Sequence, residues 1–334
     1  MESVKELLII YWRDVPLFFD WVLLILGMAL LIKGADFFVD GSSGIAKKFR
    51  IPSIIIGLTL VSLGTSAPEI SISINAVLAG ASDMSVGNVV GSNICNIFLI
   101  LGMAAIFTPL LISKDIKKYD IPIMIGIFIL LIVFAYLITP NMINWWEGLI
   151  LLLLFIGYTI FLILRTKQQE QTEEVEEKKP NIIKCVIFVV LGLAAIIFGG
   201  NLVVNNAQSI ALELGMSETL VSLTIVAVGT SLPELVTSVV AAFKKEGDIA
   251  VGNVIGSCIF NVILILGLAS IVAPIGPDKY LTVQAGVLLD VIIMLSGGVV
   301  LLLISCFSKK VTRWQGIVML VTYVAYIVYI IIRN

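Results

Sequence analysis

Two short stretches place a proline and a glutamate among apolar residues: GTSAPE at 64–69 and GTSLPE at 229–234. Proline has no N–H, so within a helix it deprives the carbonyl four residues earlier of its partner and opens that turn. Each bent turn then offers a carboxylate, two hydroxyls and main-chain oxygens together. At bilayer depth, unpaired backbone survives only where protein, water or a ligand satisfies it. The two stretches are therefore candidates for a ligand site.

A second set of oxygens follows each stretch. Polar residues recur every four positions and form one stripe on an otherwise apolar helix: Asn88, Ser92 and Asn96, then Asn253, Ser257 and Asn261. The chain has no histidine, and hard oxygen ligands without nitrogen or sulfur suit Ca²⁺ or Na⁺. A carboxylate at the bilayer centre costs about 3 kcal/mol or more, so Glu69 and Glu234 require a cation or protons. The pattern predicts a cation site, in which Asn88 and Asn253 are either ligands or bridges between helices.

Composition indicates the elements that must position these residues. Charged residues make up 13% of the chain and hydrophobic residues 59%, whereas soluble domains carry roughly 25% charged residues. A membrane-spanning helix needs about 20 mostly apolar residues. Ten such segments are present, near 20–46, 52–79, 84–109, 120–139, 145–164, 183–212, 217–243, 249–274, 281–305 and 314–332. The predicted fold class is an all-α polytopic membrane protein with ten transmembrane helices.

The segments fall into two related halves. Shifting the sequence by 165 residues aligns 34–102 with 199–267 without a gap, and 27 of the 69 positions are identical. Each half holds five spans, so equivalent segments cross the bilayer in opposite directions and form two inverted five-helix repeats, a plan common in secondary transporters. Glycines at 87 and 91, and at 252 and 256, form faces that let helices approach closely.

The chain divides into four parts. Residues 1–19 are expected to be an interfacial N-terminal segment, 20–164 the first five-helix repeat, 165–184 a solvated cytoplasmic linker and 185–334 the second repeat. Sixteen of the 21 Lys and Arg residues fall on one side if the N-terminus faces out. By the positive-inside rule both termini are then predicted outside the cell membrane.

Three acidic residues in the apolar segments have no acidic counterpart in the repeat: Asp36, Asp40 and Asp290. We expect local pairing for them, with Lys33 as a partner for Asp36, although a transport role stays open. The four cysteines form no CxxC motif and are expected to be small core residues. No basic stripe indicates nucleic-acid binding, and no obligate protein partner is evident.

The pairs GTSAPE…GNVVGSNICN and GTSLPE…GNVIGSCIFN resemble the two alpha repeats of the cation/Ca²⁺ exchanger superfamily. The likeness is nearest its sodium/calcium exchanger branch and covers essentially the whole chain. The central insert is short, so the chain resembles the compact prokaryotic form. The resemblance implies exchange of Na⁺ for Ca²⁺ by alternating access at a midplane site, with both ions as substrates and no cofactor. It also implies that the first and sixth segments, glycine-rich near Gly34 and Gly199, slide past the other eight.

The resemblance assigns roles to individual positions. Glu69 and Glu234 would be the main Ca²⁺ ligands, with main-chain oxygens of Thr65 and Thr230. The sodium ligands would be Ser66, Ser92, Ser231, Ser257, Asn96 and Asn261, with main-chain oxygens of Ser62 and Ala227 as possible additions. Asn261 stands where potassium-dependent members carry aspartate, which argues against K⁺ co-transport.

Three other functions compete with this interpretation. A Ca²⁺/H⁺ antiporter would use the same glutamates as proton carriers, because a desolvated carboxylate has a raised pKa. A channel conducts through a continuous pore with no counter-ion, which an internal inverted pair fits less well. An intramembrane enzyme needs a nucleophile–base pair or a metal cage, and neither pattern is present in the sequence, so the protein is not expected to be an enzyme.

Overall fold

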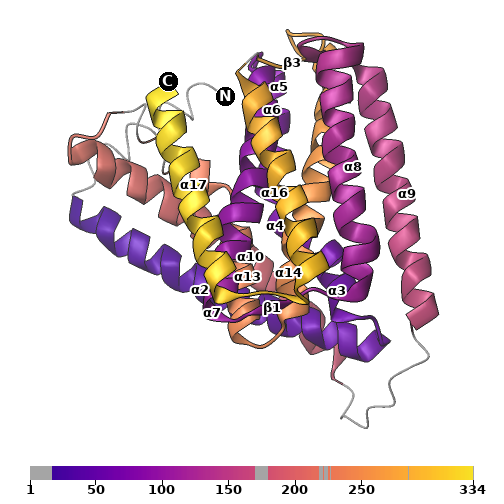
Figure 1. The fold of residues 1–334 in the computed structure, drawn as a ribbon. Coiled ribbons are helices and arrows are strands. Elements are labelled where there is room, and N and C mark those ends of the chain that lie inside the picture. Colours follow the sequence, from indigo (N-terminus) through magenta and orange to yellow (C-terminus); the bar gives the residue numbers. More distant parts are fainter. Residues whose placement is uncertain are drawn as a thin grey trace.

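The structure, a computed structural model, describes residues 17–169, 180–217, 227–284 and 286–333, together with Val221 and Ile225. It is predominantly helical (Figure 1). In this part of the chain eight helices are long and apolar enough to cross a membrane, and one further pair, Ser53–Thr65 and Ala67–Leu78, does so with a bend of 45°. The protein is a helical polytopic membrane protein.

The elements before the polar insert include π-helical turns, labelled η. They are α2 (Leu17–Phe49), α3 (Ser53–Ile56), η1 (Gly57–Val61), α4 (Ser62–Thr65), α5 (Ala67–Leu78), α6 (Ser82–Ile94), η2 (Cys95–Ile100), α7 (Leu101–Phe107), β1 (Leu110–Leu111), η3 (Ile116–Asp120), α8 (Ile121–Ile132), η4 (Val133–Ile138), β2 (Met142–Ile143) and α9 (Trp145–Gln169).

The elements after the insert have a similar order. They are α10 (Ile182–Glu213), α12 (Ala227–Gly229), α13 (Leu232–Phe243), α14 (Gly247–Phe260), η6 (Asn261–Leu266), α15 (Gly267–Val272), the 3₁₀ turn η7 (Ala273–Ile275), β3 (Leu281–Thr282), α16 (Val287–Phe307), β4 (Lys310–Val311) and α17 (Arg313–Arg333).

Nine of the ten expected segments correspond to the eight long helices and the bent pair, and most of their ends agree within a few residues. The tenth, 217–243, is only partly described. The expected segment 281–305 starts too early: α16 begins at Val287, because Leu281–Thr282 pairs as a strand. For the segment 217–243 the structure describes α13 and parts of what precedes it, and residues 218–220, 222–224 and 226 lie outside the described residues. The interfacial segment expected at 1–19 lies mostly outside them too, as does 170–179 of the linker, into which α9 extends as far as Gln169.

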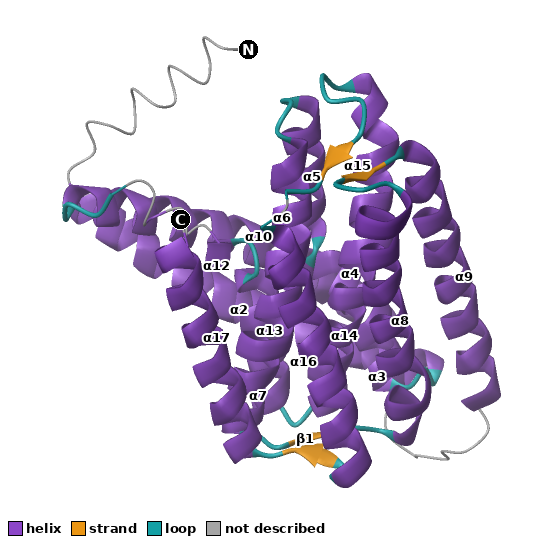
Figure 2. Ribbon diagram, turned by 45° about the horizontal axis from the view of Figure 1, so that its top comes forward, coloured by secondary structure: helices purple, strands orange, loops and turns teal. Residues whose placement is uncertain are grey.

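Helices α2 and α10 form a pair that lies obliquely across the more upright helices (Figures 1 and 2). Their backbones approach at glycines: a Cβ on Gly34 would lie 2.9 Å from the Gly192 carbonyl oxygen, and one on Gly199 would lie 2.8 Å from the Gly27 oxygen. Many of the exposed side chains on both helices are large and apolar, among them Ile25 and Phe198. This exposure is expected of a lipid-facing surface.

Of the eight long helical spans, the two that carry the polar stripes are the most deeply buried: Ser82–Phe107 and Gly247–Ile275 have 78% and 67% of their most apolar stretch buried. The expected close approach holds for α14, where a Cβ on Gly252 would lie 2.7 Å from the Ile54 oxygen. At Gly87 and Gly91 no described atom lies within 4 Å of such a Cβ.

Two short antiparallel strand pairs join loops that are far apart in the sequence. Strand β1 pairs with β4, with Leu110 opposite Val311, and β2 pairs with β3, with Met142 opposite Thr282. They lie at opposite ends of the upright helices (Figure 2). Each pair satisfies backbone groups of loops that link the spans.

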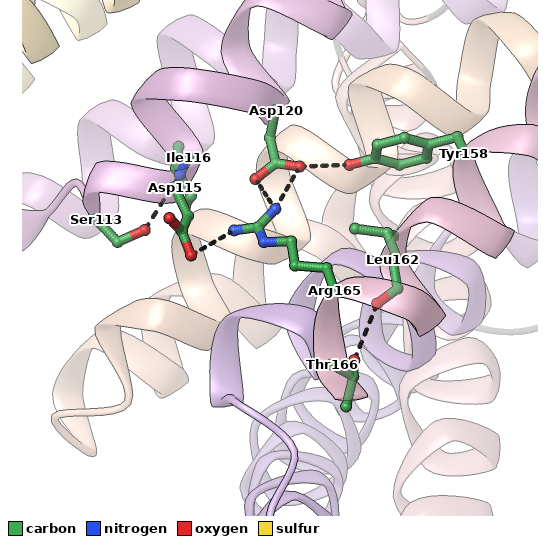
Figure 3. A network of polar contacts seen from close by, with 8 residues as sticks. All are labelled: Ser113, Asp115, Ile116, Asp120, Tyr158, Leu162, Arg165 and Thr166. Carbon is green, nitrogen blue, oxygen red and sulfur yellow. Dashed lines mark hydrogen bonds and ion pairs between the residues drawn. The ribbon is translucent and has the colours of Figure 1, made fainter. Parts of the chain in front are cut away.

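A buried ion pair fastens α9 to the start of α8. Arg165 on α9 places Nη1 2.8 Å from Asp120 Oδ2 and 3.1 Å from Oδ1, and the Tyr158 hydroxyl donates to Asp120 Oδ1 at 3.0 Å (Figure 3). Asp115 Oδ2 lies 3.5 Å from Arg165 Nη2. Arg165 was expected to begin the solvated linker, and that expectation is wrong. Its side chain is buried and forms an ion pair with the buried carboxylate of Asp120.

Candidate cation-binding site

The two glutamates lie in the first turns of helices that start at a backbone break. Helix α5 begins after Ser66 (φ −81°, ψ 7°) and α13 begins after Ser231 (φ −92°, ψ 8°), with Pro68 and Pro233 in the first turn of each. Proline is well tolerated there, because the first helical N–H groups have no intrahelical partner. The unpaired N–H groups of a helix start also favour a negative charge. The sequence therefore places each carboxylate where its helix stabilises it.

Contacts between the halves bring the two motifs together. Ser66 Oγ lies 3.0 Å from Glu234 Oε1 and 3.2 Å from Ser257 Oγ. Thr65 Oγ1 lies 3.1 Å from Asn253 Oδ1 and also reaches the carbonyls of its own helix. The bend after α4 is thus packed against the start of α13 and the middle of α14.

Several predicted site residues carry buried oxygens that make no hydrogen bond. Both glutamates are 1% exposed. The unpartnered atoms on predicted residues are Glu69 Oε2, Glu234 Oε2, Ser231 Oγ, Asn96 Oδ1 and Asn261 Oδ1. Buried polar atoms are normally paired, and each one left unpaired carries a desolvation cost. Oxygens alone, on two carboxylates, a hydroxyl and two amides, form a donor set that a hard cation would complete.

The remaining predicted residues are placed on the same elements. Ser92 is buried on α6, and Thr230 is half-buried between α12 and α13. The Ser62 carbonyl accepts from Ser66 N at 3.1 Å, whereas Ser231 N bonds the Val228 carbonyl, not that of Ala227. The two bends therefore share their dihedral angles but differ in one backbone hydrogen bond.

The two asparagines that were left open between ligand and bridge both form bridges between helices through their amide nitrogens. Asn88 Nδ2 lies 3.4 Å from the Glu69 carbonyl and 3.1 Å from Ser73 Oγ. Asn253 Nδ2 lies 3.5 Å from the Glu234 carbonyl and 2.9 Å from Ser238 Oγ. Each asparagine links the helix that carries the polar stripe, α6 or α14, to the helix that bears the glutamate, α5 or α13.

The sequence that forms this site matches a known protein family. The family model described as sodium/calcium exchanger protein matches residues 19–164 and 184–332. The chain belongs to the sodium/calcium exchanger family. Among curated relatives it is 34% identical over 346 residues to sodium/calcium exchanger MaX1 of Methanosarcina acetivorans, covering 92% of this chain and 97% of the relative. It is 35% identical over 316 residues to putative antiporter CaxA of Alkalimonas amylolytica, covering 91% and 96%.

The fold agrees with that membership. A solved structure of the sodium-calcium exchanger NCX_Mj, soaked with zero Na⁺ and Ca²⁺, superposes with a TM-score of 0.80 at 32% identity, covering 93% of this chain and 98% of the other. The two stretches matched by the exchanger model leave out 165–183, which holds most of the polar insert, and include both glutamate motifs.

In this exchanger-family chain the three acidic residues without an acidic counterpart in the repeat, Asp36, Asp40 and Asp290, form ion pairs with residues of other helices or loops. Lys244 Nζ lies 2.6 Å from Asp36 Oδ1 and 2.6 Å from Asp40 Oδ1, whereas Lys33 is 3.9 Å from Asp36. Asp290 forms a two-pronged pair with Arg333 at the end of α17. Local pairing was expected, with Lys33 as the partner of Asp36, but the main partner of Asp36 is Lys244, which lies 208 positions away. Burial lowers the pKa of Lys244, but hydrogen bonds and charge from Asp36 and Asp40 outweigh it and raise the pKa above its usual range.

Three cysteines, at 95, 185 and 258, are buried free thiols as expected, whereas Cys306 is exposed on the outer face of α16. Among the described residues no group of three or more His, Cys, Asp or Glu side chains comes together. A cation at this exchanger's site would rely on two carboxylates and neutral oxygens.

Sequence reasoning did not single out Asn93, which is fully buried and contacts Asn261 directly. The available signal was a break in the repeat: within the matched GSxIxN pattern Asn93 stands opposite Cys258. A polar residue replacing a small apolar one at a core position of one repeat marks a contact that only one half makes.

Proposed function

We propose that this chain is a secondary antiporter that exchanges Na⁺ for Ca²⁺ at a site built from the two GTSxPE motifs. The observation that carries the proposal is the set of buried, unpartnered oxygens on Glu69, Glu234, Ser231, Asn96 and Asn261. Family membership supports ion exchange and not enzymatic catalysis, and the relative MaX1 is named a sodium/calcium exchanger.

The proposed architecture has ten transmembrane helices in two inverted five-helix repeats. The matching bridges of Asn88 and Asn253 support it, because residues 165 positions apart make the same two contacts in each half. Alternating access would follow from movement of the α2–α10 pair against the other helices, since this pair lies obliquely across the upright helices and its two members pack on each other through glycines.

In the proposed mechanism the two ions compete for overlapping oxygens. Ca²⁺ would bind the carboxylates of Glu69 and Glu234 and the main-chain oxygens of Thr65 and Thr230. Na⁺ would bind among the side chains of Ser66, Ser92, Ser231, Ser257, Asn96 and Asn261, with the carbonyls of Ser62 and Ala227. Bare carboxylates are costly to carry across an apolar barrier, so the transporter moves only when loaded, and the two fluxes are coupled.

We also propose that both termini lie outside and the polar insert in the cytoplasm. The Lys and Arg distribution supports this orientation. The strand pairs agree with the grouping of the loops, because β1 and β4 both lie in loops assigned to the inside and β2 and β3 both lie in loops assigned to the outside.

A Ca²⁺/H⁺ antiporter is the second candidate. The same buried carboxylates favour it, since protons satisfy unpaired carboxylate oxygens as cations do. The hydroxyl and amide oxygens favour sodium in our proposal, because they add ligands that a proton carrier does not use.

The test is ⁴⁵Ca²⁺ uptake into proteoliposomes loaded with Na⁺ or with choline at matched pH. Glu69→Gln removes a site carboxylate, and Glu213→Gln makes the same change at an exposed position at the end of α10. We expect uptake that requires internal Na⁺, is abolished in Glu69→Gln and persists in Glu213→Gln. Uptake that ignores Na⁺ and follows a pH gradient would establish the proton antiporter instead, and uptake indifferent to both gradients would favour a channel.

A further inference from the structure

Asn93 sits at the junction of three helices in the core. It lies on α6 and is 0% exposed. Its Nδ2 donates to the Cys258 carbonyl on α14 at 3.2 Å and contacts Met294 Sδ on α16 at 3.5 Å. Its Oδ1 accepts from Asn261 Nδ2 at 3.0 Å. Both ends of this amide are therefore engaged, and one of them holds a predicted sodium ligand.

The direction of this chain of hydrogen bonds is fixed at one end. The Cys258 carbonyl can only accept, and the Met294 thioether is also an acceptor, so the end of the Asn93 amide that faces them must be the NH₂ group. The Asn93 oxygen must then face Asn261. Since that oxygen can only accept, Asn261 must turn its own NH₂ group toward Asn93.

The hydrogen bond to Asn93 determines the direction in which the side-chain oxygen of Asn261 points. With its nitrogen held by Asn93, the amide directs Oδ1 the other way, and this atom is buried and unpartnered. Asn261 follows Ser257 by four residues and shares its helix face, and Ser257 is in contact with Ser66 beside Glu234. The free oxygen is therefore one helical turn from the cluster that joins the two motifs.

We propose that Asn93 is a positioning residue for sodium: it orients the Asn261 amide so that its oxygen, not its nitrogen, is presented to the transported Na⁺. This inference rests on the proposed function. An amide in the reverse orientation would present two N–H donors to a cation, which repel it. The other half lacks this device, because the position equivalent to Asn93 is Cys258, whose side chain makes only a 3.9 Å contact to the Asn93 carbonyl.

The test measures ion binding by the purified full-length protein, as thermal stabilisation titrated with NaCl against choline chloride and, separately, with CaCl₂. Asn93→Leu removes the orienting amide at similar volume, and Asn93→Cys copies the residue found in the other half, in case leucine prevents folding. Cys258→Ala is the matched control, because it leaves the carbonyl that Asn93 uses. Loss of a residue that orients a ligand typically weakens metal binding by 10-fold or more.

We expect the Asn93 variants to raise the half-saturating Na⁺ concentration about tenfold, with that for Ca²⁺ changed by less than about twofold, since the carboxylates dominate Ca²⁺ binding. In Asn261→Ala the oxygen is already gone, so adding Asn93→Leu or Asn93→Cys should raise the Na⁺ requirement no further. Equal weakening of both ions, or additive effects in the double variants, would overturn the positioning role and leave Asn93 as a packing residue.

The two proposals fail in different ways. If wild-type protein is stabilised by both ions but the Asn93 variants titrate like wild type, the positioning inference is wrong and the exchanger proposal stands. If wild-type protein gives no saturable response to Na⁺, sodium coupling itself is wrong, and the role of Asn93 in sodium binding falls with it.

Discussion

Ser66 Oγ lies 3.0 Å from Glu234 Oε1, so a hydroxyl of the first motif holds the carboxylate of the second. The reciprocal contact is absent, because Ser231 Oγ makes no hydrogen bond and Glu69 Oε2 is unpartnered. Two motifs with nearly the same sequence thus have different surroundings. One oxygen of Glu234 is therefore held by Ser66, whereas its Oε2 is unpartnered, as Glu69 Oε2 is.

This asymmetry predicts unequal effects for two equivalent substitutions. Ser66→Ala removes a hydrogen bond to a buried carboxylate, and such bonds contribute about 1.5–3 kcal/mol. We expect the Ca²⁺ concentration for half-maximal ⁴⁵Ca²⁺ uptake to rise about tenfold, the equivalent of about 1.4 kcal/mol. Ser231→Ala removes no hydrogen bond seen in the structure and should cost clearly less. Equal shifts in the two variants would show that the contact between the motifs does not matter for Ca²⁺.

Gly252→Ala tests the close approach of α14 to the segment before the first motif. The added Cβ would lie 2.7 Å from the Ile54 carbonyl oxygen and 2.9 Å from Gly57 Cα. Both are main-chain atoms, so relief requires a helix to shift, and overpacking of this kind costs about 1–3 kcal/mol. We expect a lower thermal midpoint in detergent and weaker transport. Gly157→Ala on the exposed face of α9 is the control and should be neutral or slightly stabilising. A wild-type midpoint for Gly252→Ala would contradict the packing.

Local patterns in the sequence explain why much of this architecture could be anticipated. Hydropathy over about 20 residues reflects the thickness of the bilayer, so the helical spans followed from composition. The bend near Pro68 followed from the chemistry of a missing N–H, and the break indeed occurs at Ser66. The four-residue spacing placed Ser257 and Asn261 on one face before any contact was known.

Contacts between distant segments could not be predicted from local sequence patterns. Lys244 binds Asp36 and Asp40 across more than 200 positions, and a charge pattern within one segment pointed only to the neighbouring Lys33. The strand pairs were missed because two-residue strands have no detectable period. Arg165 was taken for part of a solvated linker, since its buried partner Asp120 lies on another span. Polar pairing between helices depends on which faces meet, and that is a property of the assembled fold.

The Lys244 cluster predicts a specific pH dependence of stability. Lys244→Met leaves two carboxylates of α2 without their main cation, and a partly buried network of this kind contributes on the order of 1 kcal/mol. Because the folded-state pKa of Lys244 is raised, its contribution is fully present below the unfolded value and is lost as pH rises through the folded one. The deficit of Lys244→Met should therefore be constant from pH 7 to 9 and shrink above about 10.4.

Thermal unfolding of wild type and variant across this range is the measurement. Lys33→Met is the matched control, since Lys33 is exposed and 3.9 Å from Asp36, and it should change the midpoint little. A deficit for Lys244→Met equal to that of Lys33→Met would show that the 2.6 Å contacts add no stability.

The Arg165–Asp120 pair predicts that two substitutions together do less damage than one. Arg165→Met leaves Asp120, 0% exposed, as an uncompensated buried charge, and breaking a buried pair in this way costs about 3–5 kcal/mol. Replacing the whole pair with apolar residues removes that cost, so Arg165→Met with Asp120→Leu, and with Tyr158→Phe to avoid a stranded hydroxyl, should recover much of the stability. The yield and thermal midpoint of monodisperse protein measure both effects, with Arg313→Met as an exposed-arginine control. A combined variant that is less stable than Arg165→Met alone would contradict this prediction. It would show that the hydrogen bonds and geometry of the network in Figure 3 hold α8 and α9 together, in addition to the pairing of opposite charges.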